Sequence, residues 1–397
     1  MSNAGPSDLS LELDAEGNSA GVEREDVGDQ IVDPFDPRLI DVVTEVRSLD
    51  SLIRRIESGQ IDLDPDFQRS RGIWTPKKKS LLIESLLLRI PLPTFYVAEL
   101  DTGGLLGDNP WAVVDGIQRL STIVEFVKPQ ALKLAPLRLD GLEYLHDEEG
   151  HTYAELAPSL QLRLLESQFT MQVIRRSTPE AVKLNIFARI NTGGVPLSSQ
   201  ELRHALVPGP SRSFLKSMAA SDAFQQAVAH SVSPTRMSDR EMALRFIAFR
   251  LTDPSSYRET DLDGFLRNAM RSVNEWSDAD RQAWMDDFQG AMRASTAVFA
   301  DDAFRKRYSA NDPRKPVSKA LFEAVAVGFA QLRSDHGDSA ITKAIARAPR
   351  IRSAFIKLMS DQSFDRAVSQ GTGDPLKVQE RFARIRRMFE EQIGVPS

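Results

Sequence analysis

The pattern of hydrophobic and polar positions divides the chain into two parts. Up to about residue 211, short apolar runs alternate with amphipathic runs of helical spacing. The runs at 94–100, 111–114 and 169–175 are short and rich in β-branched and aromatic residues, which predicts strands. From residue 212 on, only helical spacing remains. We therefore expect an α+β domain followed by an all-α helical domain.

Capping signals mark several of the predicted helices. Thr75-Pro76 has the form of an N-cap followed by proline at the first helical position. Ser177 with Glu180, and Ser198 with Glu201, fit the capping box, and the first of these two helices is expected to run to about residue 190. Further helices are expected at 48–58, 158–167, 239–251, 262–273, 278–300, 317–333 and 378–392. Short extended pieces are expected at 61–69 and 137–145.

Length and charge suggest three regions. A chain of 397 residues exceeds what one hydrophobic core usually supports. We expect a disordered acidic tail at 1–30, a mixed domain at 31–211 and a helical domain at 212–397. The tail is polar, lacks aromatic residues and holds eight acidic residues against the single base Arg24. The rest of the chain has 48 acidic and 49 basic residues, so no overall basic field indicates nucleic acid.

Composition also excludes several kinds of chemistry. The absence of cysteine excludes disulfides, thiolate-bound zinc and a cysteine nucleophile. The five histidines are scattered, so a histidine-based metal centre or an HNH-type nuclease centre is not expected. No apolar run approaches the roughly 18 residues of a membrane span, and the first residues lack a secretory signal pattern. We expect a cytoplasmic protein with no membrane partner.

The strongest chemical candidate is the pentapeptide DGIQR at 115–119, between an expected strand and an amphipathic run. The start of a helix favours anions through its N–H groups and its dipole. Gly116 would let a ligand approach the main chain, and Arg119 can donate two hydrogen bonds to a phosphate. Asp115 could hold a metal or orient a water. The alternative is an acidic helix cap with a turn glycine, in which Arg119 is an ion-pair partner.

A second candidate surface is the basic segment 343–357, which holds five bases and no acid. Its residues Arg347, Arg350 and Arg352 are our candidates for contact with DNA phosphates. The competing interpretation is a solvated helix face.

Three ordered segments resemble the signature blocks of a known family. They are PDFQRSRGIWTPKKKSLLIESLLLRIPLPTFYV (65–97), DGIQRL (115–120) and FARINTGGVPLSSQELRHAL (187–206). These blocks resemble the GmrSD-type domain, the N-terminal half of bacterial modification-dependent restriction enzymes and of related antiphage proteins. The resemblance implies a ParB/sulfiredoxin-like nucleotide-binding fold that hydrolyses a nucleoside triphosphate with Mg²⁺.

The resemblance also implies site residues. At the matching positions it makes Asp115, Gln118 and Arg119 catalytic, with Asp115 as the metal-binding residue. It makes the following residues nucleotide-binding: Gly116, Phe67, Gln68, Arg69, Arg189, Asn191, Thr192 and Gly193.

Simpler roles stay open for part of this set. Phe67 could belong to the core and Arg69 to the solvated surface, while Asn191 and Gly193 could simply end a helix.

The chain departs from the family's usual Asp-Gly-Gln-Gln-Arg signature at one position, because Ile117 replaces the first glutamine. If that side chain meets the ligand, hydrolysis is weakened or lost. If it faces the core at the first helical turn, little changes.

Three functions follow from these observations. The first is a DNA-gated nucleoside triphosphatase of a bacterial restriction or antiphage system. The alternative is a non-catalytic sensor of nucleotide or modified DNA that works with a separate nuclease or modification protein. This alternative is favoured by Ile117 and by the lack of a histidine-rich nuclease half after residue 212, which suggests a stand-alone form. The third is a DNA nuclease, which ranks last because no D…ExK-like cluster is evident.

Overall fold

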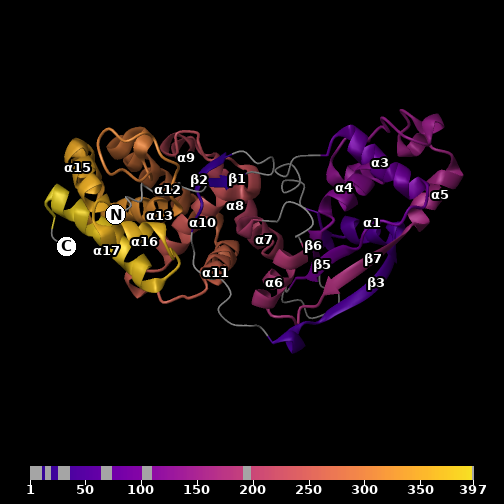
Figure 1. Ribbon diagram of the computed structural model, residues 1–397, viewed down its shortest axis with the longest axis horizontal. Helices are drawn as coiled ribbons and strands as arrows, with labels where there is room; N and C mark the ends of the chain where they lie inside the picture. Colours follow the sequence, from indigo (N-terminus) through magenta and orange to yellow (C-terminus); the bar gives the residue numbers. More distant parts are fainter. Residues whose placement is uncertain are drawn as a thin grey trace, which may run out of the picture. The chain divides into compact units, whose positions relative to one another are not determined.

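The computed structural model describes residues 11–13, 19–25, 36–63, 74–100, 110–190 and 198–395 (Figure 1). The chain divides into two compact units. A mixed unit comprises Pro34–Leu206, and a helical unit comprises Val207–Ser397 together with Met1–Asp33. The expected domain boundaries were 31 and 211, and the two units are described separately below.

The described strands of the mixed unit form one five-stranded sheet in the order β3-β7-β5-β6-β4. Its strands are β3 (Val42–Ser48), β4 (Ile61–Asp62), β5 (Phe95–Glu99), β6 (Trp111–Asp115) and β7 (Gln168–Ile174). β5 pairs antiparallel with β6 and parallel with β7, β3 pairs antiparallel with β7, and β4 pairs parallel with β6. The two residues of β4 pair with the first two residues of β6, Ile61 with Trp111 and Asp62 with Ala112.

Helices cover both faces of this sheet. They are α1 (Leu49–Glu57), α3 (Pro76–Leu87), α4 (Ile117–Val127), α5 (Pro158–Glu166), α6 (Glu180–Ile190) and α7 (Ser199–Leu206). In Figure 1, α6 and α7 lie on one side of the strands, and α1, α3, α4 and α5 lie on the other. On the first side, Phe187 of α6 and Leu202 of α7 pack against Ala98, Val114 and Ile174.

The expected strands at 94–100, 111–114 and 169–175 are confirmed as β5, β6 and β7. The capping signal at Thr75-Pro76 is also confirmed, because Thr75 Oγ1 accepts a hydrogen bond from Lys78 N at 3.3 Å and Pro76 begins α3. Strand β3 was not predicted; its sequence VVTEVRS does not alternate regularly between apolar and polar residues, and it lies at the edge of the sheet.

The capping box expected at Ser177 was wrong. Helix α6 begins at Glu180, and Ser177 Oγ instead donates to Asp41 Oδ2 at 2.6 Å. Asp41 lies 136 residues earlier in the chain, so the local sequence pattern does not reveal it. A tertiary hydrogen bond has replaced the local one.

The segment 137–145, where short extended pieces were expected, forms no strand of the sheet. It is held by the buried carboxylate of Glu84 on α3, which accepts hydrogen bonds from the backbone N–H groups of Glu143, Tyr144 and Leu145 at 2.7–3.1 Å. Because these donors are main-chain groups, this contact does not depend on the side chains of residues 143–145.

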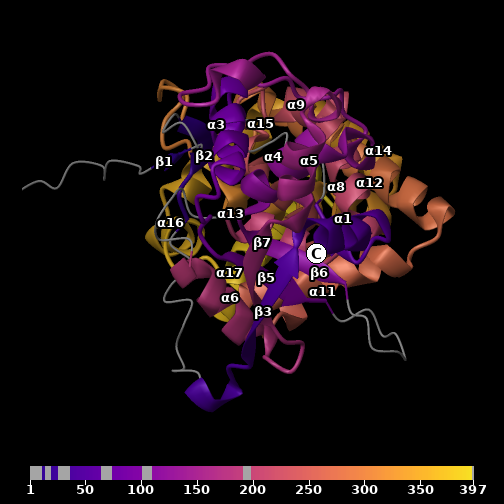
Figure 2. The ribbon, with the colours of Figure 1, turned by 90° about the vertical axis from the view of Figure 1, so that its right-hand side faces the viewer.

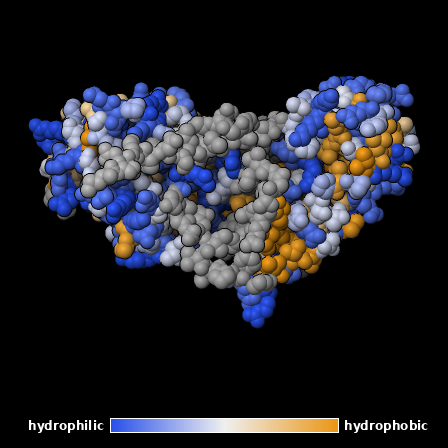
Figure 3. Space-filling view, in the orientation of Figure 1, coloured by the Kyte–Doolittle hydropathy of each residue, from blue (hydrophilic) through white to orange (hydrophobic). Residues whose placement is uncertain are grey.

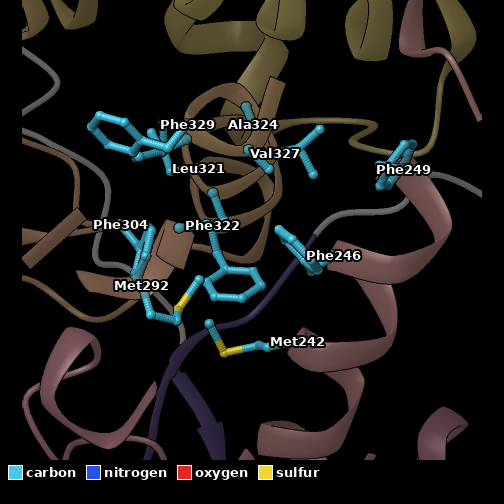
Figure 4. Packing of buried hydrophobic residues seen from close by; sticks show 14 of the residues in the cluster. Met242, Phe246, Phe249, Met292, Phe304, Leu321, Phe322, Ala324, Val327 and Phe329 are labelled. Atoms are coloured by element: carbon cyan, nitrogen blue, oxygen red, sulfur yellow. The ribbon is translucent and has the colours of Figure 1, made fainter. Parts of the chain in front are cut away.

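The described part of the helical unit from residue 207 on contains helices and isolated bridges but no strand, as expected. The helices are α8 (Pro210–Ala220), α9 (Asp222–Ala227), α10 (Ser238–Leu251), α11 (Leu262–Glu275), α12 (Asp278–Phe299), α13 (Lys319–His336), α14 (Asp338–Ala346), α15 (Ala348–Met359), α16 (Gln362–Ser369) and α17 (Pro375–Ile393). Helix α13 contacts α10, α12 and α17 and forms the centre of the core. Figure 4 shows its Phe322 among Met242, Phe246, Met292 and Phe304.

Part of the N-terminal segment belongs to this helical core. Strands β1 (Leu11–Leu13) and β2 (Ser19–Glu23) pair antiparallel, and Val22 is fully buried among the helices. Here the structure differs from the disordered tail that the composition suggested. None of the helices in the described part of the chain has the length and apolar content that a membrane span requires.

Replacing Glu84 should test how the 137–145 segment is held. Burial opposes the charge of this carboxylate, but its backbone donors lower its pKa below the usual 4.5. The charge therefore stabilises the fold above pH 4.5, and this contribution is lost as the pH falls through the lower folded-state pKa. We expect Glu84→Gln to lower the free energy of unfolding by about 1–3 kcal/mol at pH 7, and by less below pH 4.

Urea unfolding at both pH values measures this difference, with Glu143→Gln, an exposed acid of the same segment, as the control. A loss that is equal at the two pH values would contradict a role for the charge.

Candidate functional site

The site begins with an irregularity at the end of β6. Val113 lies opposite Val97 of β5, but Asp115 lies opposite Tyr96, so Val114 is an extra residue on this strand. Bulges of this kind redirect the side chain that follows them. The Asp115 side chain is 39% exposed at the junction between β6 and α4.

Gly116 forms the sharp turn between the strand and the helix. It is the N-cap of α4 and has φ +92°, a conformation that favours glycine. A Cβ atom placed on it would lie 2.5 Å from Phe95 Cδ1 and 3.0 Å from Arg119 Nη2. The space beside Gly116 is thus occupied by the chain itself. The expected approach of a ligand to the main chain at Gly116 stays a prediction, limited to the directions that these two side chains do not fill.

Arg119 is engaged inside the protein. Its Nη2 donates to Asp115 Oδ2 at 3.0 Å and to the carbonyl of Thr94 at 3.2 Å, and its Nη1 donates to the carbonyl of Pro93. The guanidinium lies 4.5 Å from the ring centroid of Phe95, and its side chain is 13% exposed. Burial lowers the pKa of Arg119, while Asp115 opposes this shift.

These contacts correct the role expected for Arg119. It is an ion-pair partner that fixes Asp115 and the start of β5, rather than an open fork for a phosphate. Sequence reasoning missed Pro93, Thr94 and Phe95, because two of them contribute only main-chain carbonyls and the third looks like an ordinary strand residue.

Ile117 and Gln118 occupy the first turn of α4. Ile117 is 4% exposed, so it faces the core and does not present its side chain to a ligand. The Nε2 atom of Gln118 is buried, and within the described part of the chain no group accepts its hydrogen bonds. An unsatisfied buried amide is costly, so we expect an acceptor from outside the described residues.

Two further groups of expected residues lie outside the described residues: Phe67, Gln68 and Arg69, and Asn191, Thr192 and Gly193. The described part of the chain is interrupted after Leu63, and β4, which lies just before this point, pairs with Trp111 and Ala112 at the start of β6 rather than with its end at Asp115. Arg189 lies in the last turn of α6.

The capping box of the third block is confirmed. Ser198 N donates to Glu201 Oε2 at 2.7 Å, and Glu201 N donates to Ser198 Oγ at 3.1 Å. Arg203, on the same helix, is buried and donates from Nε to Gln200 Oε1 at 2.8 Å.

A magnesium site would have to rest on few protein ligands. Among the described residues, no group of three or more histidine, aspartate or glutamate side chains could hold a metal ion. Magnesium commonly uses one or two carboxylates, with phosphate oxygens and waters completing its shell. Asp115, half-exposed at the start of α4, fits that limited role.

The structure gives two of the candidate DNA-binding arginines another role. Arg347 Nη1 donates to the carbonyl of Gln392 at 2.7 Å, and Arg352 Nη1 donates to the carbonyl of Val298 at 3.0 Å. Both carbonyls lie in the last turns of helices, where cations are favourable. Arg350 is exposed and lines a surface pocket with Lys357.

Comparison with known families agrees with this geometry. Residues 49–208 match the family model of the GmrSD restriction endonuclease, N-terminal domain. We call residues 49–208, which are similar to that domain, the GmrSD-type segment. The GmrSD-type segment contains α1 to α7 and β4 to β7 of the described elements, and DGIQR lies within it. A search of curated proteins found no match to the chain.

A substitution at Gly116 should reveal how tightly the junction is packed. Gly116→Ala combines an unfavourable φ with a clash against Phe95, so we expect a loss of about 2–4 kcal/mol in the free energy of unfolding. Gly59→Ala is the matched control, since Gly59 also has a positive φ (+74°) but nothing lies within 4 Å of its added Cβ.

The control should lose about 1 kcal/mol. Equal losses in denaturant unfolding would show that Phe95 and Arg119 do not crowd Gly116.

Proposed function

We propose that the GmrSD-type segment binds a nucleoside triphosphate with Mg²⁺ at the start of α4 and hydrolyses it, as part of a bacterial restriction or antiphage system. The observation that carries the proposal is the pair of polar groups at this turn. A half-exposed carboxylate, Asp115, and an amide with no acceptor among the described residues, Gln118 Nε2, lie beside the N-terminus of an eleven-residue helix. A ParB/sulfiredoxin-like fold for the segment is part of the same proposal.

The chemistry needs little more than positioning and charge neutralisation. Bound Mg²⁺ would neutralise phosphate charge. Asp115 would hold the metal or orient the attacking water, and Gln118 would donate from Nε2 to a phosphate oxygen. The N–H groups at the start of α4 favour the same anion. Arg119 acts as a positioning residue, because it holds Asp115 through the hydrogen bond at 3.0 Å.

The departure at Ile117 does not argue against hydrolysis. Since this side chain is buried, the substitution alters the core side of the helix rather than the side that faces the proposed ligand. Phe67, Gln68, Arg69, Arg189, Asn191, Thr192 and Gly193 remain proposed nucleotide contacts by their match to the family blocks.

Phosphate release tests the proposal directly. Each of the four nucleoside triphosphates is incubated with protein and Mg²⁺, with and without DNA. We expect Asp115→Asn to lower kcat by about 100-fold or more and Gln118→Ala by about 10-fold or more, as the loss of a catalytic contact does. Asp50→Asn is the matched control, because Asp50 is an exposed acid at the start of α1 that pairs with Arg54 at the same spacing.

The outcomes separate the three functions. If the protein neither binds any of the four nucleotides nor releases phosphate from them, the proposal is wrong. Nucleotide affinity in calorimetry without release would favour the non-catalytic sensor. Nicking of supercoiled plasmid that is lost in Asp115→Asn would favour the nuclease.

We further propose that DNA, modified DNA included, contacts the helical unit on the exposed face of α15. Arg350 and Lys357 lie two turns apart on this helix and line one pocket. A separate nuclease or modification protein would complete the system.

Charge reversal tests the DNA surface. Arg350→Glu with Lys357→Glu should weaken DNA binding. Fewer phosphate contacts release fewer counterions, so the slope of log affinity against log salt should become shallower by about 2. The control pair is Arg271→Glu with Arg293→Glu, exposed residues of α11 and α12. An unchanged slope in the first pair would place the DNA contact elsewhere.

A further inference from the structure

The N-terminal strand β2 contacts the helical unit through an isolated parallel bridge between Val22 and Val317. Glu23 N donates to the carbonyl of Val317 at 2.8 Å, and Val317 N donates to the carbonyl of Gly21 at 3.0 Å. Val317 also forms an antiparallel bridge with Arg305 on its other side. This is the main-chain pairing by which proteins commonly capture extended peptides.

The groove beside Val317 selects particular residue types. A Cβ atom on Gly21 would lie 1.6 Å from the carbonyl oxygen of Ser231, and Gly21 has φ +73°, so glycine is required there. The next residue, Val22, is fully buried in the helical core. The strand is therefore recognised by shape as well as by its main chain.

Two carboxylates of the strand meet buried cations. Glu23 Oε1 lies 2.6 Å from Lys306 Nζ, which also donates to Ser369 Oγ at 2.7 Å. Glu25 Oε2 lies 2.5 Å from Arg245 Nη2, and Glu25 Oε1 accepts from Thr372 Oγ1 at 3.0 Å.

Arg245 continues into a network of charges beneath the strand. It pairs with Glu241 at 2.9 Å and with Glu323 at 3.2 Å. Lys319 pairs with Glu241 at 3.3 Å, and Arg381 pairs with Glu323. These side chains are all buried, and burial raises the pKa of Glu323 against the opposing cations Arg381 and Arg245.

The network balances only when the strand is present. In the described part of the unit, four cations belong to this network and its edge at Lys306: Arg245, Lys306, Lys319 and Arg381. Four carboxylates pair with them, and two of the four are those of Glu23 and Glu25. Without residues 23 and 25, these four cations would face two carboxylates: Lys306 would lose Glu23, and Arg245 would keep only Glu241 and Glu323, which is unfavourable for buried charges. The groove thus requires an acidic occupant.

We propose that the helical unit contains a binding groove for an acidic extended peptide of the pattern Gly-Val-Glu-x-Glu, and that residues 19–25 occupy it as an exchangeable ligand in cis. Nucleic acid is a poorer occupant, because it offers no N–H and C=O groups at the spacing that pairs with Val317. The groove is separate from DGIQR, and the proposal stands independently of nucleotide hydrolysis.

Exchange can be tested in the complete chain. A protease site is inserted between Glu25 and Asp36, and cleavage then leaves both pieces present. A fluorescent peptide of residues 11–27 should replace the cleaved segment. Its binding is measured as a rise in the fluorescence anisotropy of the peptide. The same peptide with Glu23→Gln and Glu25→Gln should bind at least 10-fold more weakly. A peptide with Glu12→Gln and Glu16→Gln, which changes charge outside residues 19–25, should bind like the unaltered one.

Several results would overturn the proposal. Equal affinity of the three peptides would remove the charge argument, and displacement of the peptide by a DNA oligonucleotide would reassign the groove to nucleic acid. If the cleaved chain unfolds, hydrogen exchange in the intact wild-type protein decides. The amides of residues 21–23 should then exchange by local opening, before those of α13. Exchange of both only with global unfolding would show that the strand is a permanent part of the core.

Discussion

The hydrogen bonds of the Arg119 guanidinium hold the candidate site together. They join the end of β6 to the residues that lead into β5, so the carboxylate of Asp115 has a defined position although the strand ends there. An ion pair four residues apart on a helix surface contributes little by itself. Here the guanidinium is largely buried and is stacked on Phe95, and this packing prevents the pair from being replaced by water. The contact between Arg119 and Phe95 requires glycine at 116, because a Cβ atom there would clash with both side chains.

This arrangement changes the interpretation of the DGIQR motif. The arginine is the residue that sequence reasoning would first assign to a phosphate, yet it serves the geometry of the aspartate. The glutamine, which attracts less notice in the sequence, is the residue whose polar group is buried without an acceptor. Of the two residues, Gln118 is the better candidate for ligand contact.

Local signals in the sequence could predict much of the fold. The position of DGIQR between a strand and a helix followed from its flanking runs, and the caps at Thr75 and Ser198 depend on residues three positions away. Ser177 could not be predicted in the same way, because its partner Asp41 is distant in the chain. Similarly, residues 19–25 have the composition of a solvated tail. The cations that donate hydrogen bonds to Glu23 and Glu25 lie 283 and 220 residues further along the chain, so the local sequence does not reveal them. The carbonyl partners of Arg119 could not be predicted because main-chain groups leave no mark in the sequence.

The assignment of the first 33 residues to the helical unit makes that unit discontinuous, with the mixed unit inserted into it. On the ribosome the N-terminal strand emerges first, while Arg381, which completes the charge network beneath it, emerges about 350 residues later. At a translation rate of roughly 5–20 residues per second, on the order of 20–70 s pass between the synthesis of Glu23 and Glu25 and that of Arg381. The inserted unit contains its own strands and helices and can fold during this interval. Nascent chains of this protein would thus expose an unmatched acidic strand until the helical unit is synthesised, and the helical core would close only after α17 emerges.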